Sequence, residues 1–346
     1  MQTDASENNV LESAMGSVSP RFSIIVPVYN VGPYVSMTLR SLQIQTFTDF
    51  EVIAVDDGST DGGGAVIDHY AASDSRIRVI RQKNSGVSAA RNAGLENVRG
   101  EWVMFVDGDD ALRCDALQLL SDCILRHPSA DMIGFGYDKT DVITPDLIAE
   151  TADTNPYNEV EWNCRETVGF GALDRYMACM GAYKSEMLRE LRFEPLRNGE
   201  DVLFCNCAAF LTTCFVATNA RVYLYLQRAE SAKSNEWTER RCSDYATANE
   251  RISDNIRGCR RPVDRMWLRR WTGKLLLCEP LLHKSDKKTQ RNFYRRHRAL
   301  LMSAAGLPRL SASLRLWVRI ATAINSESYF RLTAMLPMRL YSKSRR

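Results

Sequence analysis

The 346 residues have an ordinary globular composition, 45% hydrophobic and 25% charged, which excludes a wholly disordered chain. This length is sufficient for two domains, or for one large domain with an appendage. The net charge of +3 is divided unevenly, because residues 237–346 hold 25 Lys and Arg against 8 Asp and Glu while the remainder is acidic. Such a basic region predicts an anionic partner: lipid, a phosphorylated acceptor, nucleic acid, or the acidic part of the chain itself.

Cysteine usage and the first residues of the chain indicate the compartment. The ten cysteines have no paired spacing, which favours reduced core thiols over disulfides or a metal site. Residues 1–20 are polar and lack the basic start and apolar core of a signal peptide, so we expect a disordered leader. No apolar run approaches the roughly 18 residues of a membrane-spanning helix. We therefore expect a cytoplasmic protein that can rest on the inner face of the membrane.

Short apolar runs alternate with helical patterns over the first third of the chain. Four runs are predicted to be strands buried on both faces: 22–28, 51–55, 77–80 and 102–106. Helical patterns follow them near 33–45, 62–73, 86–97 and 113–126. This rhythm predicts an α/β fold with a mainly parallel sheet and flanking helices, continued by an apolar run at 131–137.

The rest of the chain is less regular. A helix is predicted around 201–213 and a strand at 221–227, whereas residues 140–175 are expected to hold loops and irregular strands. From about residue 237, arginines alternate with large apolar residues, as in RMWLRRWTGKLLL (265–277). This alternation predicts amphipathic helices in the basic C-terminal region.

Each predicted strand of the first third ends in a polar or glycine-containing turn. The turns are YN (29–30), DDGSTD (56–61), QKNSG (82–86) and DGDD (107–110). In parallel α/β sheets the carboxyl ends of the strands lie at one edge, and ligands bind there. This coincidence is stronger evidence for a site than any one motif.

The DGDD turn places Asp107, Asp109 and Asp110 directly after a buried strand. Carboxylates this close repel one another and are costly to bury without a neutralising partner. They suit a hard divalent cation, and Mg²⁺ is usually held by one or two carboxylates together with phosphates and waters. The alternative is an acidic turn in which Asp109 or Asp110 caps the next helix.

Three further motifs carry charged residues. Asp56 and Asp57 end a strand and can accept hydrogen bonds from a base or a ribose, although the Gly-Ser-Thr that follows also fits a tight turn and a helix cap. Arg91 lies among alanines and is a candidate to neutralise phosphate or one of the aspartates. Glu200 and Asp201 open a helix, either as a general base or as acidic residues that favour a helix N-terminus.

Taken in order, these segments resemble the family 2 glycosyltransferases, which have the GT-A fold, a Rossmann-like sandwich. The segments are FSIIVPVYN through DDGSTDG, NSGVSAARNAGL, EWVMFVDGDD, and ACMGAYKSEMLRELRFEP with GEDVLF. The resemblance covers residues 21–231. It implies an inverting, metal-dependent enzyme with a catalytic domain at 21–236, divided into a nucleotide-sugar half (21–130) and an acceptor half (131–236), before a basic helical region (237–346).

The resemblance also implies roles for single residues. Asp201, paired with Glu200, would be the catalytic base. Asp107 and Asp109, with Asp110 beside them, would hold Mg²⁺ or Mn²⁺. The nucleotide-sugar would be contacted by Pro27, Tyr29, Asn30, Asp57 (at the base), Asn84, Arg91 (near the ribose or diphosphate), Asp107, Gly108, Asp109 and Arg228.

The chain departs from the family pattern in places. Gly108 stands where many members have Ser, a change that is tolerable because that side chain is not the ligand. Glycines at 62–64 are more numerous than usual, so the helix after Asp61 is expected to start late. Arg228 and Ser231 match a less uniform segment that closes over the donor. The QxxRW motif of processive members is absent, which argues against a polymerase and favours addition of one sugar.

The implied partners are a donor, most often UDP-linked in this family, and a glycan or polyprenyl-diphosphate-linked acceptor in surface polysaccharide synthesis. The basic region would dock on anionic lipid near such an acceptor, or its arginines would pair with the acidic body. Nucleic acid is disfavoured, because no recognised binding module accompanies the charge. Two alternatives stay open: a nucleotidyltransferase, for which no basic Gly-rich loop is seen near the first strand, and a catalytically silent sugar-nucleotide-binding assembly partner, against which the intact DGDD and GED motifs argue.

Overall fold

The structure is a computed structural model that describes residues 19–152, 158–168, 177–228, 238–264, 267–268, 271–272 and 286–305. Its strands are β1 Phe22–Val28, β2 Phe50–Asp56, β3 Ile77–Arg81, β4 Trp102–Phe105, β5 Ala111–Leu112, β6 Met132–Thr140, β7 Glu159–Asn163, β8 Gly181–Lys184 and β9 Cys214–Leu226. Its helices are α2 Gly32–Gln43, α3 Gly63–Ser73, α4 Val87–Leu95, α5 Ala116–Arg126, α6 Pro145–Ala149, α8 Glu200–Leu211, α9 Glu239–Gly258 and α11 Lys287–Ala305, with 3-10 turns at Ala178–Met180 and Ser185–Leu188.

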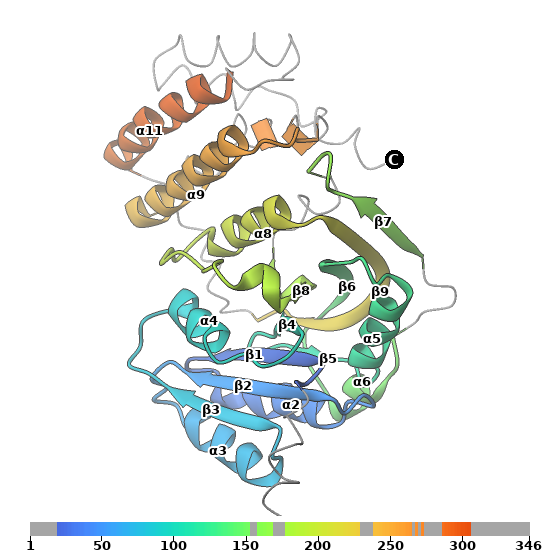
Figure 1. The fold of residues 1–346 in the computed structure, drawn as a ribbon. Coiled ribbons are helices and arrows are strands. Elements are labelled where there is room, and N and C mark those ends of the chain that lie inside the picture. The colour runs from blue at the N-terminus through green and yellow to red at the C-terminus, as the bar shows by residue number, and fades with distance from the viewer. Residues whose placement is uncertain are drawn as a thin grey trace, which may run out of the picture.

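One mixed sheet organises the described part of the chain (Figure 1). It has nine strands in the order β3-β2-β1-β4-β8-β6-β9-β5, with β7 beside β9. The four strands β3, β2, β1 and β4 are parallel. β8 is antiparallel to both of its neighbours, and β6 and β9 are parallel again. The predicted α/β fold is therefore confirmed, as a parallel Rossmann-like half that β8 joins to a second, mixed half.

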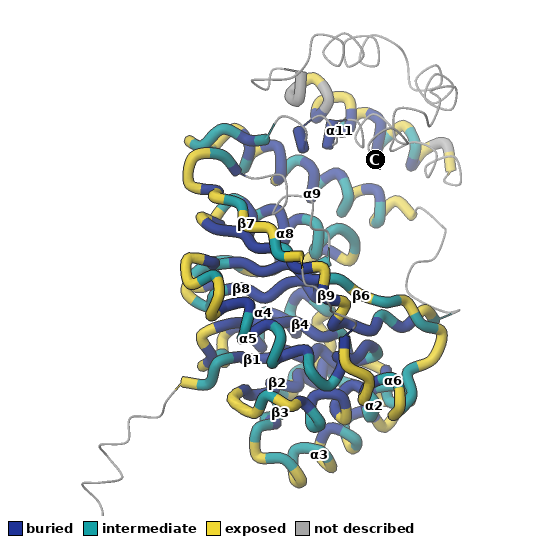
Figure 2. Tube along the Cα trace, turned by 90° about the vertical axis from the view of Figure 1, so that its right-hand side faces the viewer, coloured by how far each residue is buried: buried dark blue, intermediate teal, exposed yellow. Residues whose placement is uncertain are grey.

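The parallel half has a continuous apolar core. β1 and β2 are buried along their whole length, as their apolar runs predicted (Figure 2). α4 approaches β1 very closely, because a Cβ atom on Gly94 would come within 2.4 Å of Cγ2 of Ile25. Only glycine permits this contact, and it brings the rest of α4, including Arg91, to the carboxyl edge of the sheet.

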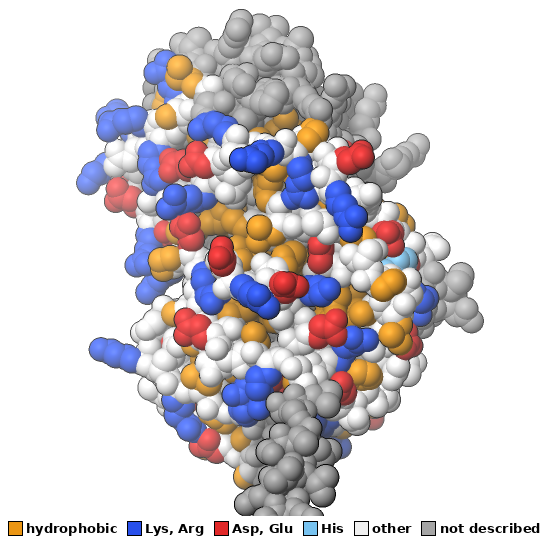
Figure 3. Space-filling view, in the orientation of Figure 1, with side chains coloured by type: hydrophobic (Ala, Val, Ile, Leu, Met, Phe, Trp, Pro, Cys, Tyr) orange, Lys and Arg blue, Asp and Glu red, His pale blue; other side chains and the backbone are white. Residues whose placement is uncertain are grey.

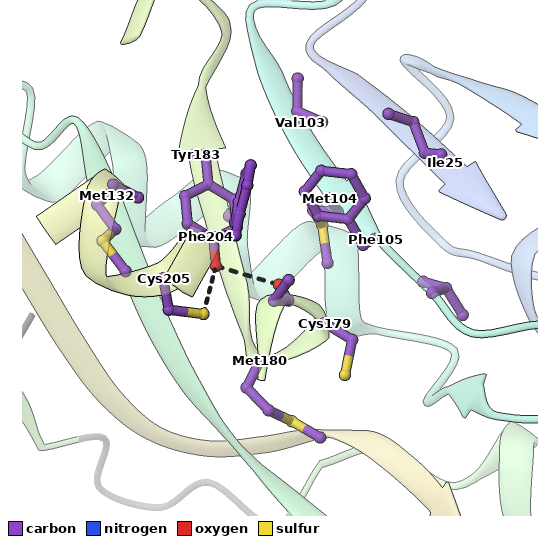
Figure 4. Close-up of a cluster of buried hydrophobic side chains, with 14 of the residues drawn as sticks. Ile25, Val103, Met104, Phe105, Met132, Cys179, Met180, Tyr183, Phe204 and Cys205 are labelled. Carbon is purple, nitrogen blue, oxygen red and sulfur yellow. Dashed lines mark hydrogen bonds between the residues drawn. The ribbon is translucent and has the colours of Figure 1, made fainter. Parts of the chain in front are cut away.

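An aromatic cluster fixes the first turn of α8 against the sheet. Phe193 and Phe204 stack with ring centroids 3.9 Å apart, and Phe105 of β4 meets both of them edge-on. Tyr183 of β8 packs edge-on against Phe204, and its hydroxyl donates to the carbonyl of Ala178 over 3.1 Å (Figure 4). These contacts fix the position of α8, which carries the predicted base at its start, relative to β4 and β8.

The C-terminal helices form a stack on this cluster. α9 packs on α8, and α11 packs on α9 (Figure 1). Arg296 of α11 ties the last two helices together, because it pairs with Glu250 over 2.7 Å and donates to Oγ of Ser243 over 2.9 Å. The predicted helical character is thus confirmed for α9 and α11. Most of the predicted amphipathic segment 265–277 lies outside the described residues, and the boundary at 236 stays a prediction.

The expected cysteine chemistry and the membrane prediction can be examined only in part. None of the nine cysteines within the described residues forms a disulfide. Among the helices that the structure describes, none combines the length and the apolar character needed to cross a bilayer. Residues 1–18 of the predicted leader lie outside the described residues.

Glu51 links β2 to the segment that leads into β4. Its side chain is 3% exposed. One carboxylate oxygen accepts from Oγ of Ser23 over 2.6 Å and from the backbone N–H of Arg99 over 2.8 Å, and the other accepts from Arg99 and Arg78. Burial alone would raise the pKa of Glu51, but these hydrogen bonds hold it below its usual range. The folded state therefore favours the ionised carboxylate.

We expect Glu51→Gln to lower the free energy of unfolding at pH 7 by about 3 kcal/mol, because the buried side chain loses its charge-assisted hydrogen bonds from Arg78 and Arg99. A carboxylate with a lowered folded-state pKa stabilises above its unfolded pKa and loses this effect as the pH falls through the folded pKa. The difference between the variant and the wild type should therefore shrink below pH 4.5. Urea unfolding at several pH values measures it. Glu101→Gln, at a carboxylate that is 47% exposed, is the control, and equal effects of both variants would contradict the assignment.

Candidate active site

Two predicted turns lie side by side at the carboxyl edge of the sheet. Asn30 adopts a positive φ of 51°, and its side-chain oxygen accepts from the backbone N–H of Thr60 over 2.9 Å. The side chain of Asp61 in turn accepts from the backbone N–H of Gly32 over 2.7 Å. Tyr29 is exposed beside Asn30, whereas Pro27 is buried within β1. The YN turn and the DDGSTD turn therefore form one wall, as the position of both after parallel strands predicted.

Asp57 organises a third turn. It is 2% exposed. One carboxylate oxygen accepts from Nε2 of Gln82 over 2.7 Å and from the backbone N–H of Ser85 over 2.8 Å, and the other accepts from the backbone N–H of Gly86 over 2.8 Å. The exposed Asn84 lies on the turn that these bonds hold. Asp57 thus fixes the conformation of the turn at 82–86. Its direct contact with the base of a nucleotide stays a prediction.

Arg91 lies at the centre of the site. It is 2% exposed, and its guanidinium rests over the ring of Phe193 at 5.1 Å. One terminal nitrogen donates to Oδ1 of Asp107 over 2.8 Å, and the other donates to Oδ1 of Asp201 over 2.6 Å. The sequence offered phosphate or one aspartate as the partner of Arg91. In the structure it joins two aspartates, one from the end of β4 and one from the first turn of α8.

A second arginine neutralises Asp109. A terminal nitrogen of Arg228, which follows β9, lies 2.7 Å from Oδ2 of Asp109, and the two side chains are 27% and 17% exposed. The guanidinium of Arg228 also lies over the ring of Tyr34 at 5.1 Å. Ser231, which the resemblance placed in the same segment, lies outside the described residues.

Negative charge exceeds positive charge in this cluster. Within the described residues, its charged groups are Asp107, Asp109, Glu200 and Asp201 with Arg91 and Arg228. Burial and the neighbouring Asp201 raise the pKa of Glu200 to about 7. Burial also raises the pKa of Asp201, against the opposing effect of Arg91, and burial with Asp107 raises that of Asp109. An additional cation would relieve this repulsion.

Asp110 differs from its two neighbours. It is 1% exposed, and its oxygens accept from the hydroxyl of Tyr223 over 2.7 Å and from the backbone N–H of Leu226 over 2.8 Å. Burial, followed by the charge of Asp107, raises the pKa of Asp110 to about 8. Its acceptors are used to tie the DGDD turn to β9, so its predicted contact with a metal gains no support from the geometry.

Asp107 and Asp109 remain the predicted cation ligands, and their chemistry fits that role. Their side chains are 28% and 17% exposed, and carboxylate oxygens are the ligands that Mg²⁺ and Mn²⁺ accept. In the part of the chain that the structure describes, no three His, Cys, Asp or Glu side chains form a complete metal site. A cation here would therefore complete its shell with oxygens from a bound phosphate and water.

Gly108 sets the position of these two carboxylates. A Cβ atom at this residue would lie 2.9 Å from the carbonyl oxygen of Pro27 and 3.1 Å from Cγ2 of Val31. The hydroxyl of Thr38 donates to the carbonyl of Gly108 over 3.0 Å. The turn is thus packed against β1 and α2, and a larger residue at 108 would require the backbone to shift.

Comparison with known proteins supports the resemblance that the motifs indicate. Residues 23–190 match the family model described as glycosyl transferase family 2. The match confirms the resemblance to the family 2 glycosyltransferases over this stretch.

Similar proteins support this assignment. The chain is 32% identical to glycosyltransferase GlyA of Streptococcus pneumoniae over 228 residues, which are 64% of this chain and 33% of that protein. It is 36% identical to the uncharacterized glycosyltransferase EpsJ of Bacillus subtilis over 200 residues, 55% of this chain and 56% of that protein. The chain thus spans between a third and just over half of these relatives. Its fold is similar to residues 1–349 of S. aureus TarS in complex with UDP-GlcNAc, with a TM-score of 0.73 and 21% identity over 91% of this chain and 90% of that chain.

Three aromatic residues that shape the site were not predicted from the sequence: Tyr34, Phe193 and Tyr223. Tyr34 lies under Arg228, Phe193 lies under Arg91, and Tyr223 donates to Asp110. The proximity of Tyr34 to the YN turn was a usable signal. The other two come from segments that only the tertiary fold brings to the site.

Proposed function

We propose that the chain transfers one sugar from a UDP-linked donor to a hydroxyl of a glycan or lipid-linked acceptor in surface polysaccharide synthesis, with inversion at the anomeric carbon. The observation that carries this proposal is the pair of carboxylates joined by Arg91. Asp107 belongs to the half predicted to bind the donor, and Asp201 belongs to the half predicted to bind the acceptor. Transfer needs a leaving-group site and a proton acceptor next to the same sugar. Asp201 would be the proton acceptor, and Asp107 would hold the cation that neutralises the leaving group. The UDP-GlcNAc in the TarS complex supports a UDP-linked donor.

The described residues suggest how the reaction proceeds. Asp201, presented at the first turn of α8, would accept the proton of the acceptor hydroxyl as the oxygen attacks the anomeric carbon. A single displacement of this kind inverts the configuration. Mg²⁺ or Mn²⁺ held by Asp107 and Asp109 would neutralise the departing diphosphate when bound. Arg228, which now pairs with Asp109, would donate to a diphosphate oxygen.

The test is an incubation of the protein with Mn²⁺, a panel of UDP-sugars and a polyprenyl-diphosphate-linked saccharide, with the product analysed by NMR. The proposal expects one added sugar in the inverted configuration. A retained configuration would contradict the single displacement. Release of pyrophosphate from a nucleoside triphosphate would instead indicate a nucleotidyltransferase, and absence of transfer from every donor would favour a silent sugar-nucleotide binder.

The basic helices suggest where the acceptor is met. Lys and Arg side chains are frequent over α9 and α11 (Figure 3), and Lys288, Arg291 and Arg295 are exposed along one face of α11. We propose that this face rests on anionic inner-leaflet lipid close to a lipid-linked acceptor. Co-sedimentation with vesicles should rise with the fraction of phosphatidylglycerol and fall with salt. Binding that is independent of anionic lipid would contradict the hypothesis.

The ion pair between Arg228 and Asp109 should compete with the cation. We expect Arg228→Ala to bind Mn²⁺ alone about fivefold more tightly, the equivalent of about 1 kcal/mol for a partly exposed ion pair. It should bind UDP more weakly, because the diphosphate loses a guanidinium. Titration followed by the electron paramagnetic resonance signal of free Mn²⁺ measures the affinity for Mn²⁺. Calorimetry measures the affinity for UDP. Arg221→Ala removes an arginine of β9 that pairs with Asp138, and should change neither quantity. Unchanged Mn²⁺ affinity in Arg228→Ala would show that the pair does not oppose the cation.

A further inference from the structure

The guanidinium of Arg91 is buried between two carboxylates that belong to different halves of the domain. Its side chain is 3% exposed, whereas those of Asp107 and Asp201 are 28% and 23% exposed. The arginine therefore lies beneath the carboxylates, on the protein side of the site. From this position it can reach the carboxylates, but a bound donor above them would meet the carboxylates first.

The frame around Arg91 is rigid. Its neighbour Asn92 makes two hydrogen bonds with the backbone of Phe193: its amide nitrogen donates to the carbonyl over 2.9 Å, and its oxygen accepts from the N–H over 2.8 Å. The ring of Phe193 supports the guanidinium on one side and stacks on Phe204 of α8 on the other. The helix that carries Arg91 and the helix that carries Asp201 are thus held together by contacts that do not involve a ligand.

We propose that Arg91 is a positioning residue, which fixes the distance and orientation between Asp201 and Asp107 and does not bind the donor. Each terminal nitrogen of the planar guanidinium donates a hydrogen bond to one carboxylate. The proton acceptor Asp201 and the cation ligand Asp107 are therefore held by one rigid group. This inference rests on the proposed sugar transfer. It replaces the contact with ribose or diphosphate that the family resemblance implied for Arg91.

The decisive variant is Arg91→Lys, because lysine keeps the positive charge but has a single ammonium group in place of two forked donors. We expect kcat to fall about 100-fold, as loss of alignment at a reacting centre does, while KM for the donor and Kd for UDP change by less than about threefold. Arg78→Lys is the matched control, because Arg78 also grips a buried carboxylate, that of Glu51, away from the site. The control should lower Tm and leave kcat unchanged.

A double-mutant cycle separates positioning from a role in stability. Because Arg91 acts through both Asp201 and Asp107, Arg91→Lys should lower kcat clearly less when Asp201→Asn is already present than it does in the wild type. An equal loss in both backgrounds would contradict the positioning of Asp201 by Arg91. A near-normal kcat in Arg91→Lys would show that charge alone suffices and would overturn the proposal. A loss of UDP affinity as large as the loss of kcat would identify Arg91 as a donor ligand instead.

Two measurements cover the remaining outcomes. Phe193→Leu keeps Arg91 but removes the ring beneath its guanidinium. It should lower kcat about tenfold without weakening UDP binding, and an unchanged kcat would contradict the role of Phe193 in supporting Arg91.

If the wild type transfers no sugar, the proposed function fails, and hydrogen exchange then decides the inference. Arg91→Lys should exchange faster at the first turn of α8 and at the DGDD turn, and unchanged exchange there would overturn it.

Discussion

Asp201→Asn is expected to reduce kcat for sugar transfer by about 1,000-fold while leaving Kd for UDP within about twofold of the wild type. Asparagine has the same shape as aspartate, and its side-chain oxygen can still accept the hydrogen bond from Arg91, which is 2.6 Å long in the wild type. It cannot accept the proton of the acceptor hydroxyl. Steady-state kinetics with saturating donor and acceptor, combined with calorimetry of UDP binding, measure the two effects separately.

The adjacent Glu200 provides a stringent comparison. Burial and Asp201 raise its pKa to about 7, so it could also exchange protons near neutral pH. Asp201 is held by Arg91, and we therefore expect Glu200→Gln to lower kcat by less than about tenfold. If Glu200→Gln were the more damaging of the two substitutions, the base would have to be reassigned to Glu200. Near-normal turnover by Asp201→Asn would refute the role of Asp201.

Asp109→Asn is expected to abolish transfer, with a loss of at least about 1,000-fold, because a bound cation contributes several kcal/mol to the stabilisation of a departing diphosphate. The substitution also removes one of the two carboxylates that fit a cation. UDP binding should therefore lose its dependence on Mn²⁺. The melting temperature with UDP, measured with and without Mn²⁺, checks this second effect independently of turnover.

Asp110→Asn is the matched control, since it changes the next residue of the same turn in the same way. Both oxygens of Asp110 are bonded within the protein, to Tyr223 and to the N–H of Leu226. We expect lower thermal stability and an unchanged dependence of UDP binding on Mn²⁺. Loss of that dependence in Asp110→Asn, or its survival in Asp109→Asn, would contradict the division of roles within DGDD.

The parallel half of the fold could be predicted closely from the sequence. The predicted strand 22–28 coincides with β1, and 51–55 lies within β2. Uninterrupted apolar runs between turn residues leave few alternatives to a buried strand. The late start expected for the helix after Asp61 is not seen, because α3 begins at Gly63, directly after Gly62 with φ of 88°, and so includes two of the three glycines.

Elements that depend on a distant partner were predicted less well. The helix expected at 113–126 begins at Ala116, because the chain before it pairs with β9: Ala111–Leu112 form β5, and the N–H of Arg113 donates to the carbonyl of Val222. β9 begins at Cys214, seven residues before the predicted 221, since its first part pairs with β6 and β7. The segment CFVATNA contains the strand-favouring residues Phe215, Val216 and Thr218. It is short, and its place in the strand is completed by its pairing with β6 and β7.

The candidate site shows the same limit. Acidic residues at strand ends could be recognised, but their hydrogen-bond partners could not. In the sequence, Asp57 and Asp110 resemble ligand-binding carboxylates. In the structure, their oxygens accept hydrogen bonds from N–H and O–H groups of other elements. The pairing of Arg91 with Asp201 joins residues 110 positions apart, and no local pattern signals such a contact.

One measurement tests the cation-dependent binding of a nucleotide-sugar: the melting temperature of the protein with UDP, GDP, dTDP or CDP, each with Mn²⁺ and with a chelator. A ligand that binds only the native state raises Tm according to its concentration relative to Kd. We predict a rise with UDP that requires Mn²⁺ and disappears in Asp109→Asn. A cooperatively melting sample in which no nucleoside diphosphate raises Tm in the presence of Mn²⁺ would contradict the proposed donor site.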